Sequence, residues 1–496
     1  MRKIYPALLM LALAALACAL PFGAQPSEEA PPAPEATAPP GEPPGEPQPT
    51  AAVGLTDAPI PAGDLLQPAN LVYRGAFRLP PGSERPLTFE YGGAAMTFNP
   101  AGDATGAGDG YPGSLFVMGH DRLPYGELPD GNRIAEVRIP APVDGGRDAL
   151  PTAEFVQPLT DALSGQFAGM EELPRAALLY LDLPLTGPRL HVAFGQHFQE
   201  DEINRGASHA WINPDLANPD FQGAWYLDGP SLYSVNGYMF EIPAEFAAAY
   251  TGGRPIASGR YRDGGWSGMG PQLYAYQPWD DSGAPVPAGQ SLPVAPLLQY
   301  HSSFDGDDFS RALAGYSHAD EWEGGAWLTT PDGRAAVIFA GTKAVGERTW
   351  YGWIDPADPT RPCIETELLG TLTLCRLAGG SPCPDSDLGG CEGHNDFRGW
   401  WSDRFEAQII FYDPADLARV ATGQLQPWEP QPYAALSLED HLLHNPDGVE
   451  PDMLGTGDQR RYRIGEVAYD RTNGLIYVLE WFADGAQPVV HVWAVE

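Results

Sequence analysis

The chain has 496 residues, with 65 Asp and Glu against 28 Lys and Arg, and a formal net charge of −37 at pH 7. An acidic surface repels phosphate backbones, so the composition excludes nucleic acid as an expected partner. Anionic lipid headgroups are likewise not expected to hold the folded body, so any contact with a membrane has to come from another part of the chain.

The first residues have the pattern of a secretory leader. Two basic residues precede an apolar run from Ile4 to Ala17, which is shorter than the ~20 residues that cross a bilayer as a helix. The run ends Ala15-Leu16-Ala17-Cys18 and resembles the lipobox of bacterial lipoproteins, although Ala15 stands where that motif usually has Leu. We therefore expect residues 1–18 to be a lipoprotein-type signal peptide with Cys18 as the lipidated residue. An ordinary signal peptide cut nearby is the alternative.

Residues 19–64 are rich in Pro, Ala, Gly and Glu. Such a segment cannot bury enough apolar surface to offset the entropy lost on ordering, so we expect a disordered tether. Leader and tether together predict an extracytoplasmic protein at the cell surface or on the periplasmic side of a membrane. The lipid is then its only contact with the membrane, and without a lipid on Cys18 the protein is secreted.

Two repeated patterns predict the architecture of residues 65–496. In the first, an apolar strand ends in a proline turn, as in Val137–Pro142, Phe240–Glu245, Trp353–Asp358 and Phe411–Asp416. In the second, a strand rich in small residues leads through a turn into a strongly apolar strand; its copies begin at Gly92, Ala176, Gly324 and Gly465, with a weaker one at Gly268. The Asp-Gly and Asn-Gly pairs in two of these turns are typical of hairpins.

Together the two patterns predict an all-β propeller. Starts near residues 92, 176, 268, 324, 394 and 465 indicate six blades, with five or seven as alternatives. We expect the early strand Leu71–Leu79 to pair with the last strand, Val489–Ala494, and so to close the ring and remove an open sheet edge. A β-sandwich, or two stacked β-domains, accounts for the strands but not for the recurring proline endings.

Four cysteines follow the leader, and all fall in a loop insertion at about residues 360–392: Cys363, Cys375, Cys383 and Cys391. An even number of cysteines in an exported chain predicts two disulfides, for which three pairings are open. A structural zinc site is the rival interpretation, but none of the spacings is the close pair that such sites favour.

Two histidines occupy equivalent positions in the repeats, directly after second strands. His120 is followed by Asp121 and Arg122, and His197 is preceded by Gln196. At the same place the later repeats have Thr342-Lys343 and Glu480-Trp481. We interpret these residues as a polar rim for a ligand, a metal ion or proton transfer, with His120 and His197 as catalytic candidates. The alternative is that they only hydrogen-bond neighbouring loops.

Carboxylates near the openings of inner strands form a second candidate set, because propeller glycosidases use paired acids. Its members are Glu90, Glu171, Glu172, Glu321, Glu323 and Glu466. Glu466 is the best single candidate, since it directly follows the small residue that opens its strand. With 65 acidic residues in the chain, an ordinary solvated face is the more common explanation.

Residues 391–403 hold the third candidate site. Its hydrogen-bonding and aromatic side chains suit the hydroxyls and the apolar ring faces of a sugar; they are His394, Asn395, Asp396, Arg398, Trp400 and Trp401. The stretch Ser303–Asp308 has oxygen ligands for Ca²⁺ but lacks the spacing of a twelve-residue calcium loop. The sequence requires no cofactor.

These features favour a binding module for a glycan or a protein ligand at the cell surface. The alternative is a propeller-type glycoside hydrolase or polysaccharide lyase, so enzymatic activity stays open; a purely structural role is a third option. The chain has no Gly-x-Ser-x-Gly elbow, no phosphate-binding loop and no His-Glu-x-x-His motif, which excludes the common lipases, nucleotide enzymes and zinc proteases as expectations.

Overall fold

The computed structural model describes residues 60–61, 63–103, 108–119, 122–123, 126–127, 133–163, 165–166, 176–195, 207–228, 237–262, 269–300, 309–352, 365–369, 372–376, 399–449, 454–455 and 457–496. The predicted signal peptide, Cys18 and nearly all of the predicted tether lie outside these residues. The chain divides into two units, Met1–Gln48 and Pro49–Glu496, and the described residues belong to the second. Within them, no helix is long and apolar enough to cross a membrane.

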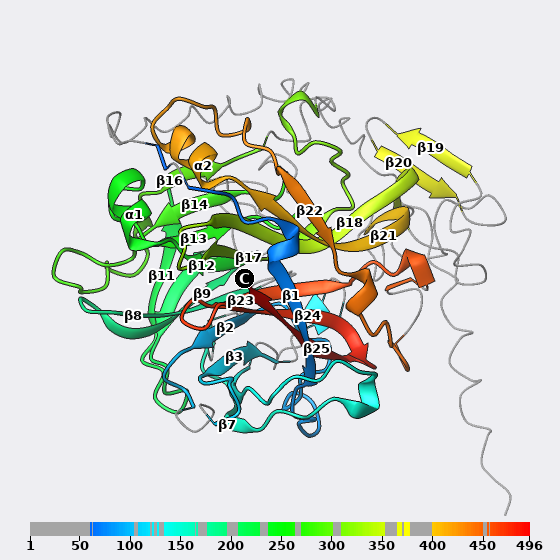
Figure 1. Cartoon of the computed structure of the whole chain (residues 1–496), viewed down its shortest axis with the longest axis horizontal. Helices are drawn as coiled ribbons and strands as arrows, with labels where there is room; N and C mark the ends of the chain where they lie inside the picture. The colour runs from blue at the N-terminus through cyan, green and yellow to red at the C-terminus, as the bar shows by residue number, and fades with distance from the viewer. Residues whose placement is uncertain are drawn as a thin grey trace, which may run out of the picture. The chain divides into compact units, whose positions relative to one another are not determined.

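Five antiparallel sheets of four main strands make up the fold (Figure 1). From inner to outer strand, blade 1 has β2 (Met96–Asn99), β3 (Ser114–Met118), β6 (Ile134–Arg138) and β7 (Phe155–Thr160); blade 2 has β8 (Ala176–Leu183), β9 (Gly187–Phe194), β10 (His209–Ile212) and β11 (Gln222–Leu227); blade 3 has β12 (Tyr238–Glu241), β13 (Ile256–Gly259), β14 (Leu273–Tyr276) and β16 (Ala295–Leu298); blade 4 has β17 (Glu321–Thr329), β18 (Ala335–Gly352), β21 (Gly399–Tyr412) and β22 (Ala434–Ser437); blade 5 has β23 (Ile464–Asp470), β24 (Leu475–Asp484), β25 (Gln487–Val495) and β1 (Leu71–Arg78). Smaller strands are β4 (Arg122–Leu123), β5 (Gly126–Glu127), β15 (Ser291–Leu292), β19 (Glu365–Leu369) and β20 (Leu372–Arg376).

The inner strands of the five sheets form a ring. β2 contacts β8, β8 contacts β12, β12 contacts β17, β17 contacts β23, and β23 contacts β2. Small residues permit this close approach: a Cβ on Gly465 would lie 2.1 Å from the carbonyl oxygen of Gly93, and one on Gly324 would lie 2.5 Å from the amide nitrogen of Val467. The fold is therefore a five-bladed β-propeller, and the predicted all-β propeller class is correct.

The preferred count of six blades is corrected to five, one of the two stated alternatives. Tyr238–Glu241 was expected to be a third strand but is the inner strand of blade 3, whose third strand is Leu273–Tyr276. The start near residue 394 corresponds to β21, a third strand. The error has a physical cause: in an antiparallel blade the first and third strands run in the same direction, so a proline turn ends either of them at the same face.

The two ends of the described chain meet in blade 5. β1 pairs with β25 from Leu71↔Val495 to Arg78↔Val489, so the predicted pairing between the early strand and the last one is present. A bulge interrupts this ladder between Tyr73 and Gly75.

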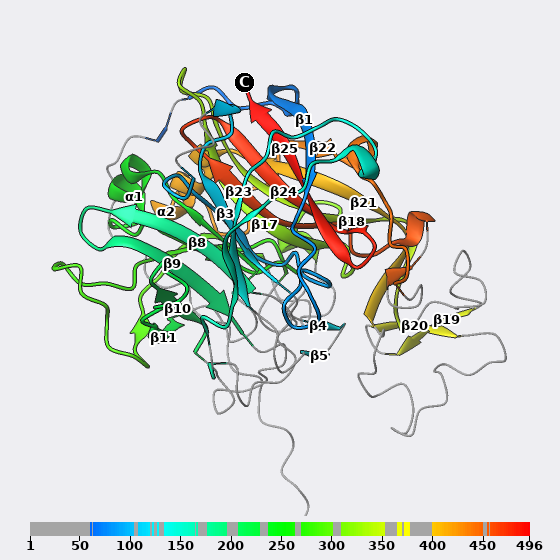
Figure 2. The same cartoon turned by 90° about the horizontal axis from the view of Figure 1, so that it is seen from below.

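The antiparallel topology gives the ring two distinct faces. The connections from second to third strands, and from each outer strand to the next inner strand, all lie at one face, which we call the loop face. The opposite, or terminal, face carries the start of the body and the chain end: Leu65 bridges to Ala335, the first residue of β18, and the amide of Glu496 donates to the carbonyl of Asn70 at 2.8 Å. Figure 2 shows the C terminus at the opposite end from β4 and β5.

Two helices follow proline turns at the terminal face. They are α1 (Ala244–Tyr250) and α2 (Pro414–Ala421). The Asp413 carboxylate accepts the amide hydrogen of Ala415 at 2.7 Å and so caps α2, which satisfies one of the amides that a helix start leaves unpaired.

Blade 4 extends beyond the ring on the loop face. Its inner strand stops at Glu321, opposite Thr342, but β18 and β21 stay paired as far as Gly352↔Gly399. We call residues 343–352 and 399–406 the arm. β20 continues it by pairing with β18 at Tyr351↔Leu374 (Figure 1).

Candidate functional site

Many of the predicted site residues lie outside the described residues: His120, Asp121, Gln196, His197, His394, Asn395, Asp396, Arg398 and the Ser303–Asp308 stretch. Three of the four cysteines do too, and Cys375 is described only as part of the backbone of β20, so the disulfides stay a prediction. Arg122 begins β4. Because β3 and β9 are both second strands, the chain leaves them toward the loop face just before His120 and His197.

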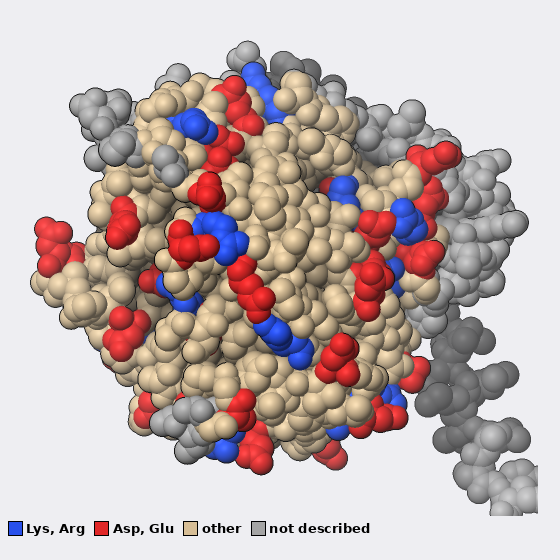
Figure 3. Space-filling view, viewed as in Figure 1, with Lys and Arg blue, Asp and Glu red and all other residues tan. Residues whose placement is uncertain are grey.

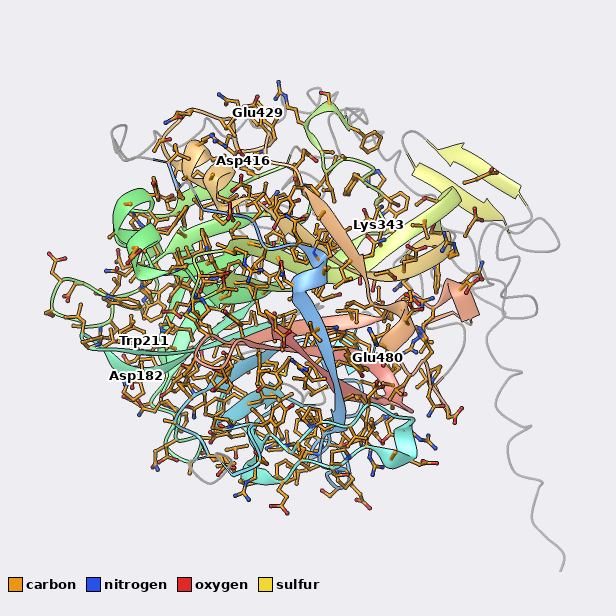
Figure 4. The ribbon with its side chains drawn as sticks, viewed as in Figure 1. Asp182, Trp211, Lys343, Asp416, Glu429 and Glu480 are labelled. Carbon is orange, nitrogen blue, oxygen red and sulfur yellow. The ribbon has the colours of Figure 1, made fainter. Side chains whose placement is uncertain are left out.

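The predicted rim positions of blades 4 and 5 are described, and both are engaged in hydrogen bonds. The hydroxyl of Thr342 accepts the amide hydrogen of Arg463 at 3.2 Å. Lys343 Nζ donates to the two carboxylate oxygens of Asp320 at 2.8 and 2.9 Å and to the carbonyl of Ala344 at 3.1 Å. These bonds use all three donors of the ammonium group, so Lys343 (labelled in Figure 4) clamps the loop before β17 onto the arm.

Glu480, at the equivalent position of blade 5 (Figure 4), is fully buried. Its carboxylate lies 2.9 Å from His491 Nε2 and accepts the amide hydrogens of Leu443 at 2.8 Å and His444 at 2.9 Å. Burial acts to raise the pKa of Glu480, but the hydrogen bond and charge of His491, the charge of Arg460 and the amide bond from Leu443 leave it below its ordinary value. The carboxylate therefore holds strands and a loop together as an anion.

Three arginines precede β23 at the loop face, and this feature was not identified from the sequence. Arg460, Arg461 and Arg463 are each at most 3% exposed. Arg463 Nη1 lies 2.8 Å from Glu439 Oε2, while the guanidinium carbon of Arg461 lies 4.7 Å from the ring centre of Trp401. Three basic residues within four positions of a very acidic chain were the available signal.

Glu466 lies on the inner strand of blade 5 and has no exposed surface. Its Oε1 accepts the amide hydrogens of Val467 at 2.9 Å and Gly325 at 3.4 Å, whereas its Oε2 has no hydrogen-bond partner among the described residues. Burial raises its pKa well above the ordinary value, and the charge of Glu323 adds to the effect. The side chain thus has the electrostatics of an acid, but it is enclosed in the ring instead of facing a substrate.

The two predicted tryptophans of the arm have different environments. Trp401 is fully buried and packs in a cluster with Ala319, Ala344 and Phe405. Trp400 packs partly against this cluster and keeps part of its surface exposed. Adjacent residues of a strand point to opposite faces of the sheet, which accounts for the difference. Only Trp400 therefore presents indole surface for a ligand.

Trp400 belongs to a set of partly exposed rings that we call the aromatic row: Phe309, Tyr316, His318 and Trp400. The ring centres are 5.9 Å apart between Phe309 and Tyr316 and 5.4 Å apart between Tyr316 and His318. His318 stacks on Trp400 with centres 4.5 Å apart and an interplanar angle of 15°. The row joins the connection between β16 and β17 to the arm. Sequence reasoning identified Trp400 alone, because the other three rings come from a segment without a repeat.

The topology and the site define a five-bladed propeller with an elaborated loop face. No family model matches the chain, and no curated protein matches it either. Among solved structures, one described as a crystal structure of glucose dehydrogenase is similar, with 12% sequence identity, a TM-score of 0.29, and coverage of 86% of this chain and 99% of that chain. Likeness at this level carries no argument about activity.

Proposed function

We propose that the protein is a lipid-anchored, extracytoplasmic propeller that binds a carbohydrate or protein ligand at its loop face. The single observation that carries this proposal is the separation of the two faces. The chain enters the body and ends at one face, while the long connections between strands lie at the other.

The entry point is firmly attached to the terminal face. The amide of Leu66 donates to the carbonyl of Ala335 at 3.1 Å, and the hydroxyl of Tyr433 donates to the carbonyl of Leu66. A tether that leaves from this point, with Cys18 as the lipidated residue, presents the loop face away from the membrane. The pairing of β1 with β25 then joins the tether directly to the ring and closes it.

The charge of the body supports a partner other than nucleic acid or an anionic membrane surface. On the face shown in Figure 3, acidic side chains are spread among uncharged ones, with isolated Lys and Arg between them. With a net charge of −37, the protein disfavours dense anions at any distance shorter than the ~8 Å Debye length of physiological salt.

A second candidate function is hydrolysis or elimination on an extracellular polysaccharide. The observation that favours it is Glu466, an inner-strand carboxyl whose raised pKa suits a general acid. Its full burial weighs against this reading, so binding is the preferred function.

The test uses the mature chain from residue 19, secreted without the lipid, and the full chain in its own cells. A ligand screen by thermal shift covers neutral and acidic oligosaccharides, because saturation at a hundredfold the Kd adds about 2.7 kcal/mol to the free energy of unfolding. Full chain that stays with the membrane, and loses this association after Cys18→Ala, supports the anchor. A ligand that protects the terminal face instead of the loop face from chemical labelling overturns the proposal.

A further inference from the structure

The aromatic row is held rigidly by polar contacts. The amide of Ala314 donates to the Gln431 side-chain oxygen at 2.8 Å, and the Gln431 amide nitrogen donates to the carbonyl of Ala312 at 3.1 Å. Closer to the arm, the hydroxyls of Ser317 and Thr349 lie 3.3 Å apart. The segment that carries three of the four rings is therefore fixed at both ends, so a ligand does not have to order it.

The row exposes aromatic surface that the fold does not require. Phe309 is 46% exposed, whereas the largest aromatic side chains of the ring interior, such as Trp322, are fully buried. A single exposed apolar residue is ordinary. Four rings whose neighbouring centres lie 4.5 to 5.9 Å apart make a continuous aromatic surface, and such surfaces mark binding sites.

The chemistry of the row matches a sugar ring better than a purely apolar partner. The aromatic faces offer apolar contact to the C–H face of a pyranose, while the Tyr316 hydroxyl and the His318 imidazole add polar atoms at the edge, where sugar hydroxyls lie. The row itself has no formal charge apart from a protonated His318, and the surrounding protein is acidic. A neutral sugar therefore fits and an anionic one does not.

We propose that the aromatic row is a subsite that stacks on neutral pyranose rings of an extracellular polysaccharide. The inference rests on the proposed function, because it names the ligand class of the loop face. Trp400 and Phe309 supply most of the contact surface at the two ends of the row. His318 and Tyr316 lie between them and set the direction of the bound chain.

Calorimetry with the mature chain tests the subsite. The probes are cellohexaose, xylohexaose, mannohexaose and maltohexaose, with hexagalacturonate as the acidic comparison. We expect at least one neutral probe to bind, Phe309→Ala and Trp400→Ala each to weaken its affinity at least tenfold, and Trp400→Phe to restore most of the loss. Leu185→Ala is the matched control, since Leu185 is an exposed apolar side chain (50%) in the β8–β9 turn at the terminal face.

The outcomes separate the subsite from the proposed function. A neutral probe that binds equally well to wild type and to both variants overturns the subsite but leaves the loop face as a binding face. Binding of hexagalacturonate alone overturns the neutral-sugar assignment. If no hexasaccharide binds and a protein ligand is retained at the loop face, the subsite is wrong and the function stands; a ligand mapped to the terminal face removes both. Phe309→Ser provides a second variant at an exposed position that does not threaten folding.

Discussion

Glu480 and His491 face each other from adjacent strands of blade 5, with His491 Nε2 2.9 Å from Glu480 Oε2 and neither side chain exposed. On the other side of the imidazole, the Tyr73 hydroxyl lies 3.0 Å from Nδ1. Burial, together with the charges of Asp144 and Glu480, raises the pKa of Tyr73, so the phenol keeps its proton. The phenol therefore donates to Nδ1 and the imidazole donates to Glu480, which links β1, β25 and β24 through one chain of hydrogen bonds.

Glu480→Ala should destabilise the protein strongly. It removes the acceptor for His491 and for the amides of Leu443 and His444, all of which stay buried. Breaking a buried pair by removing one partner costs about 3–5 kcal/mol. Urea unfolding followed by tryptophan fluorescence measures the loss. Glu154→Ala is the control: Glu154 is 76% exposed and pairs with Arg138 at 3.5 Å, and its removal should change the free energy of unfolding by about 0.5 kcal/mol or less. Equal effects for both would contradict this account.

The same carboxylate predicts a loss of stability in acid. Because the folded pKa of Glu480 lies below its unfolded value, its contribution is present above about pH 4.5 and disappears as the pH falls through the folded pKa. Glu480→Gln should therefore flatten the dependence of the urea midpoint on pH below about 4.5. A variant whose acid profile superimposes on that of the wild type would show that other carboxylates govern the acid transition.

Glu466 should behave in the opposite way. Its folded pKa is raised, so the folded state binds more protons than the unfolded one and stability falls as the pH rises from the unfolded pKa toward the folded one. Glu466→Gln keeps an acceptor oxygen for Val467 and Gly325 and removes the buried charge. We expect this variant to gain at least about 1 kcal/mol at pH 8 relative to wild type, and less at pH 5. A larger gain at pH 5 than at pH 8 would refute the raised pKa.

Gly75 should not tolerate a side chain. It has a φ of 112° at the bulge of β1, and a Cβ there would lie 2.4 Å from the carbonyl carbon of Val143. Gly187 is a matched control, because its φ is also positive, at 64°, but a Cβ would meet nothing within 4 Å. Gly187→Ala should cost about 1–2 kcal/mol from backbone strain alone. Gly75→Ala should cost clearly more, since the paired backbones of Ala76 and Val143 must separate; thermal and urea unfolding of the two variants decide this.

The fold class followed from the sequence because local patterns carry the direction of strands. Apolar runs, small-residue openings and proline turns marked nearly every blade, and the pairing of Leu71–Leu79 with the last strand is present. The blade count did not follow, because Phe240–Pro243 and Phe411–Pro414 have the same ending but lie at the ends of an inner and a third strand. A repeated ending gives the face at which a strand stops and not its place in the sheet.

The candidate site was less predictable for a different reason. Glu480 was one acid among 65 in the sequence, and only its position opposite His491 gives it a structural role. Phe309 and Tyr316 lie in a connection without a repeat, so their closeness to Trp400 depends on how that connection packs against the arm. Tertiary packing, which no local pattern encodes, brings these residues together.

The adjacent tryptophans of the arm give the sharpest contrast between packing and exposure. Trp401 is fully buried against Phe405 and under the guanidinium of Arg461, so Trp401→Ala leaves a cavity and should lower the free energy of unfolding by about 3–5 kcal/mol. Trp400 is partly exposed, and Trp400→Ala should cost about 1 kcal/mol or less while it removes sugar binding. Urea unfolding and calorimetry on both variants separate the two effects. If the two losses of stability are equal, the strand does not direct these neighbours to opposite sides of the arm.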